Sequence, residues 1–367
     1  MRASSDWPGN LGVTRSGALI VKITVVSPVY NECEVLPYLF DALPKVLAKL
    51  SDNYEIILVN DGSTDGSDQV IRQRAELDSR IKLVSFSRNF GQQAAITAGL
   101  DCASGDIIVV MDCDMQDPPE MLAPMLDKIH EGYDVVSCRR TGRDGESIFK
   151  RWSSTAFYQV MRLGIDKRIP AEVGDFRMYT RRAADALCAF REQHRFMRGV
   201  VAWLGLKEAI LPFHRPARAA GQTKYPVSKL IKLAWTAISS SSPVPLKASS
   251  YLGATMLLVS LSAACLCILG ILAGWTSTTT LAWISLMFGL SGMQMCALGL
   301  LGDYVGRVFE ESKHRPLYVV SEVCNVDQSP DQPRALWLDA TDGTSPIRIE
   351  PRVYGPIALP SSPRKVG

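Results

Sequence analysis

Several features that would assign a protein class at once are missing from this chain of 367 residues. None of its nine cysteines belongs to a C-x-x-C pair, so the usual zinc and disulfide frameworks are excluded and a reducing compartment is expected. The net charge of +3 is too small to indicate a nucleic-acid partner, and no base-reading motif is present. Residues 1–18 contain no apolar run behind Arg2, so we expect a flexible leader and not a signal peptide.

A glycine-rich dinucleotide loop is missing as well. A fold that binds NAD should carry G-x-G-x-x-G where its first strand turns into a helix. In this chain that turn is Pro28-Val29-Tyr30-Asn31-Glu32, which contains no glycine. The sequence therefore argues against an NAD-dependent oxidoreductase.

Short apolar runs alternate with helical stretches from Ala18 onward. Strands separated by helices of about a dozen residues are typical of βαβ units. The pattern predicts an α/β protein with a mainly parallel sheet and helices on both faces. The predicted strands are Ile20–Val29, Tyr54–Val59, Ile81–Ser85, Ile107–Met111 and Tyr133–Cys138.

The fourth predicted strand runs directly into an acidic turn. Asp112-Cys113-Asp114 follows its last apolar residue, and Gln116 and Asp117 come next. Ligands of open α/β sheets bind beyond the carboxyl ends of the strands. Two carboxylates one residue apart suit Mg²⁺ or Mn²⁺ and a diphosphate that such an ion bridges. A lone D-x-D is more often a solvated turn, so the interpretation depends on the other motifs.

Six motifs occur in order along the chain. They are PVYNE at 28–32, VNDGSTD at 59–65, RNFG at 88–91, DCDMQDPP at 112–119, GDFR at 174–177 and GQTKY at 221–225. The set resembles inverting family 2 glycosyltransferases of the polyprenyl-phosphate hexose synthase type, such as bactoprenol glucosyltransferases and dolichyl-phosphate mannose synthases. The resemblance implies a GT-A (Rossmann-like) fold. It also implies transfer of a hexose from a nucleotide-diphospho sugar, such as UDP-glucose, to polyprenyl (undecaprenyl) phosphate.

The resemblance also assigns roles on the donor side. Asp61 is placed to accept a hydrogen bond from the nucleotide base, and Tyr30 to pack on that base, although a turn and helix cap would use the same residues. Asp117 is interpreted as a turn residue, and Cys113 replaces the small residue common in relatives. The expected nucleotide-binding residues are Pro28, Tyr30, Glu32, Asp61 and Asp112, and the expected ligands of Mg²⁺ or Mn²⁺ are Asp112, Asp114 and Gln116.

On the acceptor side, Asp175 matches a family position near the lipid phosphate. Asp175 and Asp114 are the expected catalytic residues. Because a phosphate acceptor is already ionised, we interpret Asp175 as an orienting group. General-base catalysis and a structural pair with Arg177 remain open. Arg177, Arg218 and Lys224 are expected to hold the phosphate. For Arg218 and Lys224, a general attraction to anionic lipids is the alternative.

The C-terminal part indicates a membrane. Leu252–Trp275 and Leu281–Leu301 carry no charge, and each approaches the roughly 20 residues that span hydrocarbon. Lysine and arginine flank both outer ends, which predicts a catalytic domain on the cytoplasmic side of the inner membrane. Two buried core helices are the alternative. Ser147–Gly164 and Val227–Ile238 are interpreted as amphipathic interfacial helices.

The resulting domain plan has five parts. Residues 1–18 are a leader, 19–225 the cytosolic catalytic domain, 226–248 an interfacial segment, 249–308 two transmembrane helices, and 309–367 a cytosolic tail expected to be disordered after about 322. The family resemblance also suggests a homo-oligomer.

Two rival functions were weighed. A processive polysaccharide synthase should carry Q-x-x-R-W after the acceptor motif, but Gln159–Leu163 lacks the tryptophan and precedes Gly174. An inactive membrane scaffold is disfavoured by the intact carboxylates.

Overall fold

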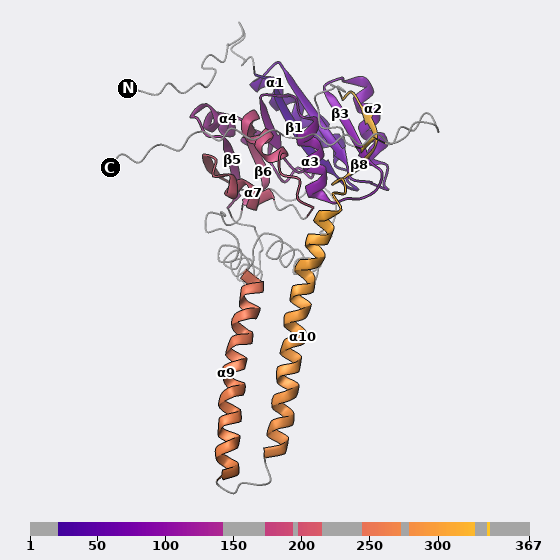
Figure 1. The fold of residues 1–367 in the computed structure, drawn as a ribbon. Helices are drawn as coiled ribbons and strands as arrows, with labels where there is room; N and C mark the ends of the chain where they lie inside the picture. Colours follow the sequence, from indigo (N-terminus) through magenta and orange to yellow (C-terminus); the bar gives the residue numbers. More distant parts are fainter. Residues whose placement is uncertain are drawn as a thin grey trace, which may run out of the picture.

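A nine-stranded sheet forms the centre of the molecule in the computed structural model, which describes residues 21–141, 173–193, 197–214, 244–272, 279–326 and 336–337. These residues form an α/β head from which two long helices extend (Figure 1). The strand order is β7-β5-β6-β4-β1-β2-β3-β8-β9. The strands are β1 (Ile23–Val29), β2 (Tyr54–Asn60), β3 (Ile81–Phe86), β4 (Ile107–Val110), β5 (Val135–Arg140), β6 (Val173–Thr180), β7 (Glu208–Phe213), β8 (Val319–Cys324) and β9 (Leu336–Trp337).

Helices pack on both faces of this sheet through two separate apolar cores. The first core joins the sheet to α1 (Leu36–Leu50), α2 (Ser67–Leu77) and α4 (Leu122–His130), the last preceded by the 3-10 turn η1 (Pro119–Met121). The second joins it to α3 (Gln92–Cys102), α6 (Arg181–Cys188) and α7 (Met197–Leu204). Strands covered on both faces read as continuous apolar runs, as β2 does with every residue buried. The predicted α/β layering is therefore confirmed.

The sheet is mostly parallel, but it contains antiparallel junctions that the sequence interpretation did not foresee. β6 lies between β4 and β5 and runs antiparallel to both. A strand that runs antiparallel to its neighbours starts at the edge of the sheet where those neighbours end. β6 therefore begins at the edge where β4 ends, and it brings Gly174 and Asp175 there.

The chain returns to the head after the second long helix. β8 pairs antiparallel with β3, and Glu322 on β8 forms an ion pair with Arg72 of α2 at 2.6 Å. The Asn325 side chain donates hydrogen bonds to the carbonyls of Ala75 and Ile81. This corrects the domain plan, which assigned residues 319–324 to a separate tail: their partner strand is distant in sequence, so no local pattern reveals the pairing.

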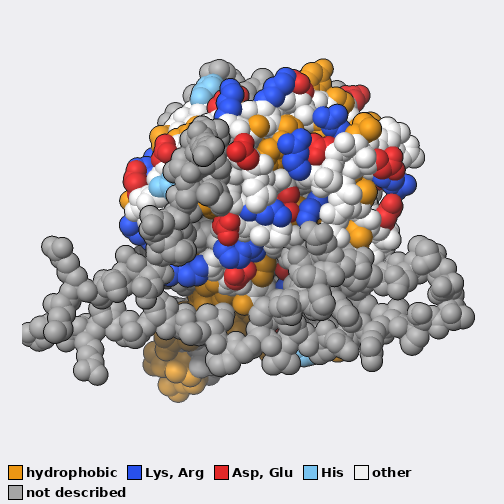
Figure 2. All heavy atoms as spheres, turned by 90° about the horizontal axis from the view of Figure 1, so that it is seen from above, with side chains coloured by type: hydrophobic (Ala, Val, Ile, Leu, Met, Phe, Trp, Pro, Cys, Tyr) orange, Lys and Arg blue, Asp and Glu red, His pale blue; other side chains and the backbone are white. Residues whose placement is uncertain are grey.

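The two long helices, α9 (Val244–Leu272) and α10 (Thr279–Ser312), lie side by side (Figure 1). Among the described residues, no helix combines the length and the apolarity needed to cross a membrane. The structure thus gives the two expected spans no support. Seen from the end opposite these helices, the head carries interspersed basic and acidic side chains (Figure 2).

A buried carboxylate, Glu55, binds neighbouring strands together away from the edge where β4 ends. Glu55 on β2 accepts a hydrogen bond from Thr24 Oγ1 at 2.6 Å and pairs with the ammonium groups of Lys22 and Lys82, each at 2.9 Å. Burial alone would raise the pKa of Glu55, but these donors outweigh it and lower the pKa to about 2. The ionised form is therefore the one that the fold requires.

Replacing Glu55 by glutamine should destabilise the protein in a pH-dependent way. A pKa lowered from 4.5 to about 2 corresponds to about 3 kcal/mol of stability. This contribution is fully present above pH 4.5 and disappears as the pH falls through 2. Thermal unfolding of wild type and Glu55→Gln at pH 7 and pH 3 should show a gap that narrows in acid. The control Glu131→Gln removes an exposed ion pair to Lys128 and should change little. A gap independent of pH would contradict the role of the ionised form.

Candidate active site

Carboxylates from distant parts of the chain meet at the carboxyl edge of the sheet. Val110, the last residue of β4, pairs with Arg177 of β6. The same antiparallel register, continued two residues further, sets Asp112 level with Asp175. Both residues were predicted site residues, and the structure brings them together.

The acidic loop after β4 is held by hydrogen bonds within itself. The Asp117 carboxylate accepts from the backbone N–H of Asp112 at 3.0 Å, and the Asp114 carboxylate accepts from the N–H of Gln116 at 3.1 Å. Asp117 is fully buried and Asp114 is 5% exposed. Met115 has a φ of 58°, a left-handed conformation that folds the loop back. Asp117 is therefore more than the turn residue of the sequence interpretation, because it fixes the backbone of Asp112.

Several carboxyl groups gather around Asp112. Burial raises its pKa to about 8, and the neighbouring carboxylates of Asp117, Asp114 and Asp175 add to the effect against the opposing charge of Arg140. A carboxyl in such surroundings keeps a proton at neutral pH unless a cation replaces it. The loop therefore has the electrostatics of a cation site.

The donor types agree with Mg²⁺ or Mn²⁺, since Asp112, Asp114 and Gln116 offer only hard oxygen ligands. Among the described residues, however, no group of three acidic, histidine or cysteine side chains is already arranged around one point. A hexahydrated ion keeps several waters when it binds, and phosphate oxygens commonly complete its shell. The residues present fit an ion that is shared with a substrate diphosphate.

Asp61, at the end of β2, is occupied by the backbone of the following motif. Its carboxylate accepts hydrogen bonds from the N–H of Phe90 at 2.6 Å and of Gly91 at 3.0 and 3.2 Å. Asp61 is 3% exposed. Burial raises the pKa of its carboxyl group, although the hydrogen bonds from Phe90 and Gly91 act to lower that pKa. Asp61 thus anchors the start of α3, while its expected contact with a nucleotide base stays a prediction.

The other expected nucleotide residues lie in a loop that is tied to the DGSTD turn. Asn31, with φ of 55°, accepts at its side chain from the N–H of Thr64, and the N–H of Glu32 donates to Ser67 Oγ. Pro28 lies in β1 beside β2. Tyr30 is 43% exposed, so its ring is available to pack on a ligand.

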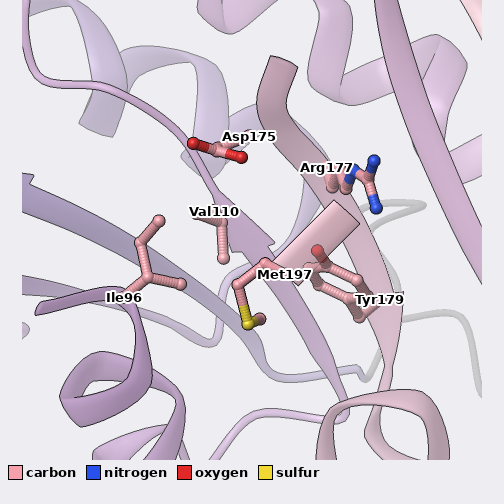
Figure 3. A pocket seen from close by; sticks show the side chains of 6 residues that line it. All are labelled: Ile96, Val110, Asp175, Arg177, Tyr179 and Met197. Carbon is pink, nitrogen blue, oxygen red and sulfur yellow. The ribbon is translucent and has the colours of Figure 1, made fainter. Parts of the chain in front are cut away.

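Arg177 is a buried cation beside these acids. It is 2% exposed, and its Nε donates to the carbonyl of Gly174. Its two terminal nitrogens make no hydrogen bond of good geometry among the described residues, but the guanidinium lies beside the Tyr179 hydroxyl and opposes the burial that raises the pKa of Tyr179 to about 12. Arg177 and Asp175 line a small pocket with Tyr179 and Met197 (Figure 3). A buried guanidinium is costly unless its charge is balanced, so Arg177 favours an anionic group beside it.

Two glutamines at the start of α3 also reach the site, and the sequence interpretation missed them. Gln92 Nε2 donates to Asp112 at 2.9 Å, and Gln93 Nε2 donates to Asp175 at 3.4 Å. The only signal in the sequence was their position, directly after the RNFG motif and at the start of a helix that follows a strand.

Several predicted residues lie outside the described part of the chain. These are Arg218 and Lys224, together with both expected interfacial helices at 147–164 and 227–238. Their roles stay predictions.

Comparisons with known proteins identify the family of this chain. Residues 24–188 match the family described as Glycosyl transferase family 2. An uncharacterised glycosyltransferase, YkcC, of Bacillus subtilis is 40% identical over 84% of this chain and 95% of its own length. A prophage bactoprenol glucosyl transferase homolog of Escherichia coli is 34% identical over 83% of this chain and 99% of its own.

Similar solved structures include a glucosyl-3-phosphoglycerate synthase from Mycobacterium tuberculosis in complex with Mn²⁺, UDP and glucosyl-3-phosphoglycerate. It is 20% identical, with a TM-score of 0.43 over 60% of this chain and 78% of that one.

Cation binding to the acidic loop should depend on pH. Because the pKa of Asp112 is raised to about 8, a cation must displace a proton at neutral pH. The apparent affinity for Mn²⁺ should therefore rise, by up to about tenfold per pH unit, from pH 6 to pH 8 and level off above. Titration calorimetry across this range measures it. Asp112→Asn should flatten the profile, whereas the control Asp127→Asn, on the exposed face of α4, should keep it. A flat wild-type profile would contradict the assignment.

Proposed function

Because the chain belongs to glycosyl transferase family 2, with the GT-A type of α/β fold, we propose that it transfers a hexose from a nucleotide-diphospho sugar to polyprenyl phosphate. UDP-glucose is the proposed donor and undecaprenyl phosphate the proposed acceptor, since relatives at 32–34% identity are named bactoprenol glucosyl transferases. The observation that carries the proposal is the meeting of Asp112, Asp175 and the buried Arg177 at one edge of the sheet.

The donor would bind over the acidic loop. Pro28, Tyr30, Glu32 and Asp61 would surround the nucleotide, and Asp112 would lie at its ribose and diphosphate. A Mg²⁺ or Mn²⁺ ion held by Asp112, Asp114 and Gln116 would offset the charge that develops on the departing diphosphate. The fixed backbone of the loop supports this assignment, since preorganised ligands need little rearrangement.

The acceptor would bind from the side of Arg177. The terminal nitrogens of Arg177 suit the oxygens of a phosphate, and Arg218 and Lys224 would also bind that phosphate. A phosphate oxygen attacks the anomeric carbon on the face opposite the nucleotide. The new C–O bond forms as the bond to the diphosphate breaks, so the configuration inverts. Asp175 would orient the acceptor or a sugar hydroxyl, because the phosphate needs no deprotonation.

Attachment to the inner membrane is part of the proposal. The uncharged stretches Leu252–Trp275 and Leu281–Leu301 lie largely within α9 and α10. Large apolar side chains are exposed along both helices, and such surfaces mark contacts with lipid or protein. They include Leu258, Leu261, Leu269, Met287, Met295 and Leu298. We further propose two spans, a head that faces the cytoplasm, where nucleotide sugars are made, and assembly as a homo-oligomer.

Purified full-length protein should transfer glucose from radiolabelled UDP-glucose to undecaprenyl phosphate. A panel of UDP- and GDP-sugars tests the choice of hexose and nucleotide. EDTA and Asp114→Ala should each abolish transfer, because both remove the cation, and Asp127→Asn should be as active as wild type. If no donor yields a lipid-linked sugar, the proposed reaction is wrong. Full activity of Asp114→Ala would contradict the proposed role of the metal ion and leave the proposed reaction standing.

The proposed topology can be tested by cysteine labelling in intact cells, after replacement of the nine native cysteines. A cysteine at Thr278, between the two proposed spans, should react with an impermeant thiol reagent added outside. A cysteine at Ser312, the last residue of α10, should react only after permeabilisation. Labelling at Ser312 in intact cells would overturn the proposed orientation.

A further inference from the structure

Gln93 joins three separate elements at the pocket. Its side chain leaves the first turn of α3, donates from Nε2 to Asp175 Oδ2 on β6 at 3.4 Å, and accepts at Oε1 from the backbone N–H of Met197, the first residue of α7, at 3.4 Å. Asp175 and Met197 both line the pocket (Figure 3). Nothing in the reaction described above uses Gln93.

The chemistry of its partners fixes which way the amide points. An ionised carboxylate only accepts hydrogen bonds, and a backbone N–H only donates them. The amide nitrogen must therefore face Asp175 and the amide oxygen must face Met197. Both distances exceed the usual 2.7–3.2 Å range for such bonds, as often occurs in catalytic sites before the substrate tightens them.

The backbone of α3 is held firmly at its start. Asp61 accepts from the N–H groups of Phe90 and Gly91, which immediately precede the helix. Gly99 allows the helix to pack closely on β1, since a Cβ there would lie 2.1 Å from Val26 Cγ1. Gln93 is therefore presented to Asp175 from a fixed position.

The end of α3 is tied to the segment that follows α10. Asp101 accepts two hydrogen bonds from Arg191, both at 2.7 Å, and one from Tyr318 Oη at 2.6 Å. Tyr318 also stacks on Phe86 of β3, with ring centroids 5.1 Å apart. Both ends of α3 are thus anchored, so a change at Gln93 acts through its own side chain and leaves the helix in place.

We propose that Gln93 is a positioning residue for the transfer reaction: its amide holds the Asp175 carboxylate in the orientation that meets the acceptor. This inference rests on the proposed function. Gln92 plays a different part, because its amide meets Asp112, in the acidic loop, at 2.9 Å. The neighbouring glutamines thus divide between the donor side and the acceptor side of one site.

Three variants separate positioning from a structural role. Gln93→Leu removes the hydrogen bonds to both Asp175 and Met197 at similar volume, and Gln93→Glu keeps an acceptor for Met197 but sets a carboxylate against Asp175. Gln73→Leu is a matched control on the exposed face of α2. One hydrogen bond to a charged group corresponds to about 10- to 100-fold in rate. Gln93→Leu should lower kcat by that factor, with KM for the nucleotide sugar within about twofold of wild type. Gln73→Leu should match wild type.

A double-variant cycle tests whether Gln93 acts through Asp175. In an Asp175→Asn background, Gln93→Leu should lower the remaining kcat by less than about threefold, because residues that act as a unit are not additive. Gln92→Leu should keep its full effect in that background. If the two losses multiply, or if Gln93→Leu leaves kcat unchanged while wild type transfers hexose, the positioning role is wrong. If wild type itself transfers no hexose, the proposed function fails instead.

Discussion

The direction of one strand determines the chemistry that this molecule can perform. β6 is inserted antiparallel between β4 and β5, so its first residues lie where its neighbours end. Had β6 run parallel to β4, Asp175 would lie at the opposite edge of the sheet, far from the acidic loop. The same reversal brings Arg177 beside the pocket. The acidic and the basic halves of the site therefore both depend on this pairing.

The site is electrostatically unbalanced in a way that calls for two ligands of opposite charge. The acidic loop cannot relax, because Asp117 and Asp114 are engaged with the loop's own backbone. Burial, and then the neighbouring carboxylates, raise the pKa of Asp112. Arg177 is buried nearby with two nitrogens that make no hydrogen bond of good geometry among the described residues. A protein core does not normally tolerate such groups, and binding sites are where it does.

Helix α3 connects this site to the rest of the molecule. Its start is fixed by Asp61, at the end of β2, and its last turn carries Asp101, which binds Arg191 and Tyr318. Tyr318 lies between α10 and β8, so the segment that leaves the long helices contacts the helix that bears Gln92 and Gln93. Glu311 of α10 also accepts a hydrogen bond from the backbone N–H of Gln193 at 3.0 Å, so a polar contact joins the head to α10 in addition to the chain itself.

The sequence by itself determined the layers, the positions of the first five strands and the family. Apolar runs bounded by turn residues identify strands wherever both faces are covered, and the comparisons confirmed the family that the six motifs indicated. The acidic loop could be found because its carboxylates are neighbours in the chain. Only the tertiary structure revealed the reversal of β6, the return of β8 to β3, and the contacts of Gln92 and Gln93. These depend on partners far away in sequence, and neither the period of a strand nor the spacing of a motif records which distant segment it will meet.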